Sequence, residues 1–600
     1  MEKLTRWQEL YEKAKTSYSD IIANIEDNNE AYDGTRKIKT PRGTNAKKQG
    51  SVSRKMCFEL IETQADITIP MPRVLSKKGR EDRAVMIENV LRNEIDRLPL
   101  EALVDEQARI TPTAGGSIFY VEWDNNIKTA FGVGGLRIRN LDPRQVIPQP
   151  GVYNLDDMDY LFIRFEQSKY YIKRTYGIDV ENEASEDNTE EDMRTHIYCY
   201  YRNEEGRIGL ISWVGDTIIQ EYDDYFARKQ NVCTKCGKVK DPSESECSCG
   251  NKKFKLENKE SEIISYGEGQ EADVKYYVPT VYPIVVRKNV SKINCFLGSS
   301  DIDFIKDQQN DLNILMNKIR EKVLKGGSYV TVPEGIKFEA TDEELKIIEI
   351  GSPAEAAQIT FNTVQPNVAT DTELLNLNYE IGRQTLGITD TFQGRRDTTA
   401  TSGKAKEIAV QQTAGRLKSK QTMKDFAFSE LYRVMFLFLL AYTDEQVPYI
   451  EENTNGKLEY KWFDKRFFID EDSDGNLYYD DEFTFSVDVA GTLANDRQAM
   501  WKETRSNFEA GAYGDPTAMD TLEMYWTTMN KLHYPCAPDA LELIIKRKQE
   551  QQMLAQQQQL QEVLVKEQTK RLLSENLDQQ RQIQNLKSND VDTVLGELGI

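Results

Sequence analysis

The strongest constraint on the fold is a helical pattern that runs without interruption from Gly403 to Tyr442. At 1.5 Å per residue such a helix spans about 60 Å, which is longer than a typical helix of a globular domain. The pattern is polar at its start and apolar from Phe426 to Leu440. We therefore expect its last part to lie in a hydrophobic core and its first part to leave that core.

Composition narrows the class of protein. The 600 residues are enough for about three to five structural units, and 29 Tyr and 22 Phe argue against wholesale disorder. The formal net charge of −22 argues against a simple basic surface for nucleic acid. Only two histidines, His196 and His533, leave little material for His-dependent catalysis, so an ordinary hydrolase is not expected.

No catalytic motif is complete in the sequence. Gly403-Lys404 resembles the end of a phosphate-binding loop, but Thr398 stands where that loop needs Gly, and Ala405 stands where it needs Ser or Thr. The longest apolar run, Val434–Ala441, is too short for a bilayer, which requires about 20 residues. With no apolar targeting segment and few cysteines, the sequence predicts a protein that is made in the cytoplasm, is not an enzyme and has no membrane contact.

The first 299 residues predict helices followed by a β-rich body. Residues 1–33 form one expected helix, and residues 80–112 form two that are separated near Leu98-Pro99. Turns are expected at Asn125-Asn126 and at Pro148–Gly151. The expected strands are Ser117–Trp123, Gly135–Asn140, Tyr160–Phe165, Ile197–Arg202 and Ile208–Ile219. The acidic tract Glu181–Asp192 is predicted to be a disordered loop.

From Ser300 the pattern becomes helical. A helix is expected up to Gly326-Gly327, followed by a compact β segment (Ser328–Thr363) and a second helix that a capping box at Thr370–Glu373 opens. The later expected elements are strands Tyr460–Ile469 and Glu482–Val489, and helices Asp496–Ala510, Thr517–Lys531, Pro538–Gln549 and Gln549–Lys587. The last helix is rich in Gln and keeps no clean heptad, so we expect it to pack against neighbouring copies of itself.

A basic segment interrupts this acidic chain. Between Gly34 and Phe58 there is no acidic residue, whereas eight are basic: Arg36, Lys37, Lys39, Arg42, Lys47, Lys48, Arg54 and Lys55. Two interpretations remain open. The segment is either a solvated loop or a contact with DNA, a capsid shell or an acidic neighbouring subunit.

Four of the eight cysteines have the spacing of a metal site. Cys233, Cys236, Cys247 and Cys249 follow the pattern C-x2-C-x10-C-x-C, and a glycine follows each pair. Four thiolates complete a tetrahedral shell, so we predict a structural zinc ion and no catalytic metal. Lysines near the motif leave a nucleic-acid contact open: Lys235, Lys238, Lys240, Lys252 and Lys253. The isolated cysteines are expected in cores: Cys57, Cys199, Cys295 and Cys536.

A second candidate metal site is acidic. Asp470, Asp472 and Asp474, followed by Gly475 and by Asp481 at position twelve, resemble the start of a calcium-binding loop. Position twelve lacks the usual Glu, and the flanking residues have strand patterns. The alternative is an acidic hairpin turn without calcium.

The order of these elements resembles the portal proteins of tailed double-stranded DNA bacteriophages or prophages. Two segments carry the resemblance: IDFIKDQQNDLNILMNKI (Ile302–Ile319) is similar to a portal stem helix, and LGITDTFQGRRDTTATSGKAKEIAVQQTAGR (Leu386–Arg416) is similar to a portal loop and the helix after it. Leu141–Tyr160 and Phe508–Asp515 are less specific similarities. The resemblance extends from the first helix to about residue 545.

The resemblance implies an α+β multidomain portal fold with a wing, a helical stem, a small β-containing clip and a helical crown, to which this chain adds a zinc-ribbon insertion. The implied parts are a wing (1–299, with the insertion at 230–256), stem helices (300–325 and 369–387), a clip (326–368), a tunnel loop (388–401), a long helix with return wing strands (402–496) and a crown (497–600).

The resemblance also implies a ring of about twelve subunits at one capsid vertex of the virion, through which DNA is packaged and ejected. Its implied partners are double-stranded DNA, the terminase large subunit, the major capsid or scaffold protein, and head-completion (adaptor) proteins. Twelve copies would carry 12 × −22 = −264 formal charges, which favours transit of DNA over tight binding. Within the channel, the candidate DNA contacts are Arg395, Arg396, Lys404 and Lys406, for which ion pairs between subunits are the alternative.

Two other functions compete with this interpretation. A zinc-ribbon nucleic-acid-binding regulator would use the basic residues, but the acidic balance elsewhere argues against it. A helical scaffold or tail-assembly protein would account for the Gln-rich helix but not for the β segment between two helices.

Overall fold

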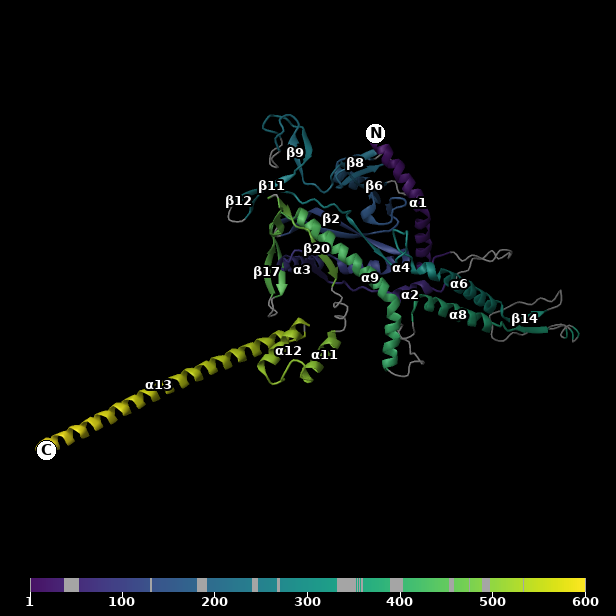
Figure 1. The fold of residues 1–600 in the computed structure, drawn as a ribbon. Coiled ribbons are helices and arrows are strands. Elements are labelled where there is room, and N and C mark those ends of the chain that lie inside the picture. Colours follow the sequence, from purple (N-terminus) through teal and green to yellow (C-terminus); the bar gives the residue numbers. More distant parts are fainter. Residues whose placement is uncertain are drawn as a thin grey trace. The chain divides into compact units, whose positions relative to one another are not determined.

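The computed structural model describes residues 2–36, 53–129, 132–180, 192–239, 246–266, 270–331, 360–388, 403–452, 458–473, 475–487, 497–532 and 534–598, together with 352, 354 and 357. The chain divides into two compact units, whose elements are drawn in Figure 1. Unit 1 consists of Met1–Tyr449 and Trp462–Asp488, and unit 2 consists of Ile450–Lys461 and Val489–Ile600.

In unit 1 the first helix packs on a five-stranded antiparallel sheet with strand order β4-β5-β6-β7-β8. The elements are α1 (Glu2–Asp33), β4 (Val146–Pro148), β5 (Tyr160–Ser168), β6 (Met193–Arg202), β7 (Ile208–Val214) and β8 (Thr217–Tyr222). Buried Tyr11 of α1 lies edge-on to Phe162 and Trp213 of the sheet. The helix expected over residues 1–33 is confirmed. The single strand expected over Ile208–Ile219 is wrong, because Gly215, at φ 55°, turns the chain between β7 and β8.

A three-stranded sheet, β13-β2-β3, shares the largest core of unit 1 with several helices. The elements are α3 (Glu81–Arg97), α4 (Leu100–Ala114), β2 (Gly116–Thr129), β3 (Gly132–Leu141) and β13 (Ile284–Lys288). The two expected helices over residues 80–112 are confirmed. The turn expected at Asn125-Asn126 is wrong, because β2 continues through this pair and only shifts its register between Asp124 and Lys128.

The long helix α9 (Gly403–Tyr442) is confirmed over its expected range. Residues Val434–Leu440 are all buried in the same core, and Phe428 lies edge-on to Phe119 of β2 with 5.7 Å between ring centroids. A two-stranded sheet formed by β1 (Pro72–Ser76) and β20 (Phe483–Val487) also contacts α9. Burial of the apolar end of α9 therefore follows the expectation from the sequence.

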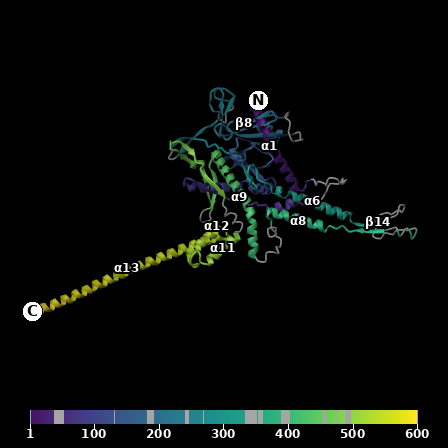
Figure 2. The same ribbon diagram turned by 45° about the vertical axis from the view of Figure 1, so that its right-hand side comes forward.

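Two antiparallel helices, α6 (Asp301–Lys325) and α8 (Ala369–Leu386), lie side by side and are joined to a hairpin of β14 (Gly327–Thr331) and β15 (Thr360–Val364) (Figures 1 and 2). Asp371 of α8 pairs with Lys318 and Lys322 of α6. We call these two helices and their hairpin the stalk.

The two stalk helices begin differently. Ser300 caps α6, because its Oγ accepts a hydrogen bond from the N–H of Ile302 at 3.0 Å. The capping box expected at Thr370–Glu373 is wrong, since α8 already begins at Ala369, whose N–H donates to the side chain of Asn367.

Smaller elements complete unit 1 and the junction with unit 2. They are α2 (Met56–Gln64), α5 (Lys169–Tyr176), β11 (Ser261–Tyr266), β12 (Gln270–Lys275), β16 (Val447–Glu452), β17 (Leu458–Phe463), β18 (Ile469–Glu471), β19 (Leu477–Tyr479) and 3-10 turns at Leu155–Asp157 and Lys465–Phe468. The strand expected over Tyr460–Ile469 is wrong, because the second 3-10 turn divides it. The Asp464 side chain opens that turn by accepting the N–H of Arg466.

The described residues of unit 2 include the helices α11 (Arg497–Glu509), α12 (Met519–Lys531) and α13 (Ala537–Leu598). Met529 and Ala537 are fully buried where α12 meets the start of α13, and Lys548 of α13 pairs with Glu523 of α12. Residues 549–586 of α13 are all exposed in the single chain. The two helices expected over Pro538–Lys587 form one continuous helix.

Several expected features lie outside the described residues. They are most of the basic segment (37–52), most of the acidic tract (181–191), most of the loop 388–401 and the middle of the β segment 326–368. None of the described helices combines the length and the apolar character that are needed to cross a membrane.

Candidate metal centre

The four predicted cysteine ligands lie at one end of a hairpin. Strands β9 (Lys229–Cys233) and β10 (Phe254–Asn258) pair antiparallel, with Cys233 opposite Phe254. Alternating hydrophobic and polar residues do not explain this hairpin, because most side chains of β10 are exposed. The pairing instead brings the two ends of the cysteine-containing segment together.

Each cysteine pair lies on a tight turn that ends in a glycine. The N–H of Gly237 donates to the carbonyl oxygen of Cys233 at 3.0 Å, and the N–H of Gly250 donates to that of Cys247 at 2.7 Å. Gly237 and Gly250 adopt φ values of 70° and 77°, a left-handed conformation that other residues rarely adopt. The glycine after each pair is therefore required by the backbone, as the sequence motif predicts.

The sulfur atoms form a compact cluster. All four Sγ atoms lie within 4.8 Å of one another, with 3.5 Å between Cys233 and Cys249 and 3.4 Å between Cys236 and Cys247. A tetrahedral ion with metal–sulfur bonds of about 2.3 Å places its sulfurs about 3.8 Å apart. A disulfide would need about 2.05 Å, so these distances fit a shared ion and not a disulfide.

Backbone and side-chain donors surround this cluster. Although burial opposes it, N–H groups of Lys235 and Cys236 lower the pKa of Cys233 to about 6, and the Asn251 side chain donates to its Sγ at 3.3 Å. The N–H of Cys249 lowers the pKa of Cys247. Although the N–H of Lys238 opposes it, hydrogen bonds with neighbouring thiols raise the pKa of Cys236 to about 12. Thiolates are the form that binds metal, so the hairpin by itself favours the ionised state at Cys233 and Cys247 and not at Cys236.

The cluster suits a closed, structural site. Each of the four coordination positions of a tetrahedral ion would be filled by a protein sulfur, which leaves no position for substrate or water. Asn251 was not singled out by its sequence, although it directly follows the second Cys-x-Cys-Gly. Its amide bonds Cys233 Sγ, Thr234 Oγ1 and the carbonyl of Lys253, and so ties both turns together.

The candidate calcium residues lie at the β18–β19 hairpin. Oδ1 of Asp470 is paired with Arg80 and Arg83, and Asp481 accepts a hydrogen bond from the hydroxyl of Tyr277 at 2.7 Å. Asp472 accepts the N–H of Ser473, and Asp474 lies outside the described residues. The flanking strands agree with the alternative of an acidic hairpin turn, and calcium binding stays a prediction.

Only two of the four candidate DNA contacts belong to the described residues. Arg395 and Arg396 lie outside the described residues, and Lys404 and Lys406 belong to the first turns of α9. Described ends of the basic segment contact their own chain: Arg36 pairs with Asp27 at 2.8 Å, and Arg54 lies 4.3 Å from the ring centre of Tyr379. Contact with DNA stays a prediction for all of these residues.

Of the isolated cysteines, Cys57 and Cys199 are buried in cores as predicted. Cys295 is half-buried and Cys536 is exposed, so the expectation of core positions is wrong for these two.

No protein-family model matches the chain, and no curated protein matches it significantly. Its function therefore has to be inferred from its own residues and their arrangement.

Proposed function

We propose that the chain is the subunit of a phage portal, a ring at one capsid vertex through which double-stranded DNA is packaged and ejected. In this proposal the stalk helices form the stem, the β14–β15 hairpin belongs to the clip, and the helices of unit 2 form the crown. The protein is not an enzyme and has no membrane partner. The terminase large subunit, capsid or scaffold protein and head-completion proteins dock on the ring.

The observation that carries this proposal is the stalk. On α8, Leu374, Leu377 and Ile381 follow i, i+3, i+7 spacing and are 38–55% exposed. They lie opposite the face that packs on α6, where Leu375 and Tyr379 are buried. An exposed apolar face on a helix is typical of a protein–protein contact.

The second stalk helix supplies a different exposed face. Phe304 and Ile314 of α6 are 49% and 38% exposed, whereas Ile305 and Leu312 are buried. A closed ring requires two unlike faces on each subunit, because its contacts are head-to-tail. The exposed apolar residues on α6 and on α8 offer two unlike candidate faces, and this supports a ring over a monomeric regulator.

The test is the assembly state of the purified chain by negative-stain electron microscopy and mass photometry. We expect rings whose central hole is near the width of duplex DNA. Replacing Leu374, Leu377 and Ile381 together by Ser should shift rings to smaller species without changing the circular dichroism. Glu373→Ser with Asn376→Ser, exposed positions on the same helix, is the matched control and should keep the rings. Monomers or filaments at all salt concentrations would reject the portal.

Within this proposal, we assign zinc as the ion of the cysteine cluster. Four thiolates favour zinc among the abundant divalent ions, and it supports a closed tetrahedral shell without redox chemistry. The ion would fold the hairpin as an insertion in the wing. Zinc-ribbon binding of nucleic acid, the competing function, predicts that the intact chain binds DNA tightly as a monomer.

A further inference from the structure

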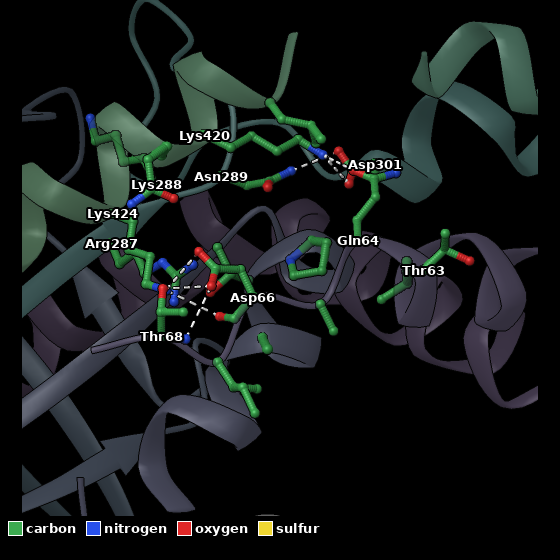
Figure 3. A pocket seen from close by; sticks show the side chains of 18 residues that line it. Thr63, Gln64, Asp66, Thr68, Arg287, Lys288, Asn289, Asp301, Lys420 and Lys424 are labelled. Atoms are coloured by element: carbon green, nitrogen blue, oxygen red, sulfur yellow. Dashed lines mark hydrogen bonds and ion pairs between the residues drawn. The ribbon is translucent and has the colours of Figure 1, made fainter. Parts of the chain in front are cut away.

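A cavity of about 410 Å³ lies where α2, α4, β13, α6 and α9 meet in unit 1 (Figure 3). This volume is within the range of small-ligand sites, roughly 300–1,000 Å³. Its charged lining residues are Asp66, Arg287, Lys288, Asp301, Lys420 and Lys424. The cavity is separate from the cysteine cluster and from the stalk faces, and the proposed function does not use it.

Both carboxylates in the lining already have a lysine partner. Lys424 Nζ lies 2.8 Å from Asp66, and Lys420 Nζ lies 2.5 Å from Asp301. Lys288 points elsewhere and donates to the carbonyl oxygen of Cys295. The two lysine–aspartate pairs are therefore neutral overall.

Arg287 forms no ion pair with a carboxylate of the described residues. Its side chain is only 8% exposed, and within the described part of the chain its Nη1 has no hydrogen-bond partner. Burial lowers the pKa of Arg287 to about 10, partly offset by Asp66 and Asp425, so the guanidinium remains charged at neutral pH. A buried guanidinium with an unused N–H donor is unfavourable, and an anion in the cavity would accept that hydrogen bond and add a compensating charge.

A second unused donor lies in the same lining. Nε2 of Gln64 is buried and has no partner among the described residues, whereas its Oε1 accepts a hydrogen bond from Lys420 at 2.8 Å. Lys420 therefore fixes the amide orientation, because Oε1 is the acceptor. Figure 3 shows Gln64 and Arg287 on different segments that border the cavity.

We propose that this cavity binds a small oxyanion, a phosphate or carboxylate group, with Arg287 as its anchor and Gln64 as a second donor. The guanidinium fork matches two oxygens of such a group. Because Arg287 belongs to β13 and Gln64 to the end of α2, the bound anion would link these two elements. Because it binds the folded chain alone, it would raise the unfolding temperature.

The test uses the full chain, scanning fluorimetry and calorimetric titration with inorganic phosphate or acetate. Sodium chloride at equal ionic strength is the control for screening. We expect a saturable rise in unfolding temperature with phosphate or acetate and none with chloride. The stronger of the two responses identifies the preferred oxyanion. No saturable response to either would overturn the proposal.

Arg287→Met should abolish the response and, because it removes an unpaired buried charge, should leave the anion-free chain at least as stable as the original. Arg287→Lys keeps the charge but loses the fork, so it should bind about tenfold more weakly or worse. Arg174→Met removes an exposed charge and should respond like the original chain. If Arg287→Met still showed the saturable rise in unfolding temperature, the proposal would be overturned. If Arg287→Met does not fold, an undiminished rise in Arg287→Lys would overturn it instead.

Discussion

The cysteine cluster and the lining of the cavity around Arg287 both bring ionisable side chains together. They differ in how far apart in the sequence these residues lie. The cluster lies within Cys233–Cys249 and is held by two turns of one hairpin. The cavity takes its charged residues from positions as distant as Asp66 and Lys424. The geometry of the first fits a bound metal ion, whereas the second depends on the packing of distant segments of unit 1.

The largest expected effect concerns the cysteine cluster. Cys233→Ser with Cys236→Ser should abolish metal binding, and metal analysis should find one equivalent fewer per chain. Structural zinc sites bind with about 10–16 kcal/mol, so hydrogen exchange in β9 and β10 should become fast. The core around α9 should keep its protection, because it shares no ligand with the hairpin.

The control for this experiment is Cys536→Ser, which removes an exposed, isolated thiol. It should leave the metal content unchanged. Unchanged metal in the double variant would contradict the assignment of these cysteines as ligands.

The next effect should appear in the cavity. Lys424→Met leaves Asp66 without its partner in a half-buried position, and breaking such a pair should cost about 2–3 kcal/mol of unfolding free energy, measured in urea. Burial lowers the pKa of Lys424 despite the opposing effect of Asp66. The metal content of the Lys424→Met variant should equal that of the original chain. This result would show that the cysteine cluster and the cavity are stabilised independently.

Lys418→Met, an exposed position on the same helix, is the matched control and should stay within about 0.5 kcal/mol of the original chain. Equal losses in the two variants would mean that the Asp66–Lys424 pair contributes nothing.

A smaller effect on metal affinity is expected from Asn251, whose side chain donates a hydrogen bond to one of the clustered sulfur atoms. Asn251→Ala removes the donor to Cys233 Sγ and should weaken metal binding about 10–100-fold in competition with a chelator. Lys252→Ala, an exposed neighbour, should not change the affinity. An unaltered affinity for Asn251→Ala would show that the backbone turns alone orient the sulfurs.

The smallest expected effect is the response of the cavity to mild acid. Although burial opposes it, hydrogen bonds from Lys424 and Thr68 hold the pKa of Asp66 below its usual value of 3.8. The unfolded chain binds this proton first, so the contribution of Asp66 is present above pH about 3.8 and is lost as the pH falls through its folded pKa. Between pH 7 and pH 5 the pair should therefore lose nothing.

The cysteine cluster should respond in that same pH range. Protons compete with the metal for all four thiolates, so bound metal should be lost progressively as the pH falls. One acid titration can follow both the bound metal and the unfolding free energy that the Asp66–Lys424 pair contributes. If that contribution were lost at a higher pH than the metal, the expected order would be wrong.

The sequence by itself determined the features whose cause is local. Periodicity located α1, α6 and α9, because a helix repeats its buried face every three to four residues. The spacing of cysteines and glycines identified the cysteine cluster, because two turns of one hairpin bring these four residues together. Two expectations from local sequence were wrong. Gly215 turns the chain and divides the strand expected over Ile208–Ile219. Asn367 accepts the N–H of Ala369, where α8 begins before the expected capping box.

Only the tertiary structure decided which distant charges meet. Nothing in the sequence distinguishes Arg287 from other arginines on strands, or Gln64 from other residues at helix ends. Their proposed roles depend on burial and on two donors, Arg287 Nη1 and Gln64 Nε2, that have no partner among the described residues. This environment arises when β13, α2 and α9 pack together. A local pattern fixes the geometry of neighbours in the chain, whereas the electrostatic environment of a buried charge is set by residues that the chain brings from far away.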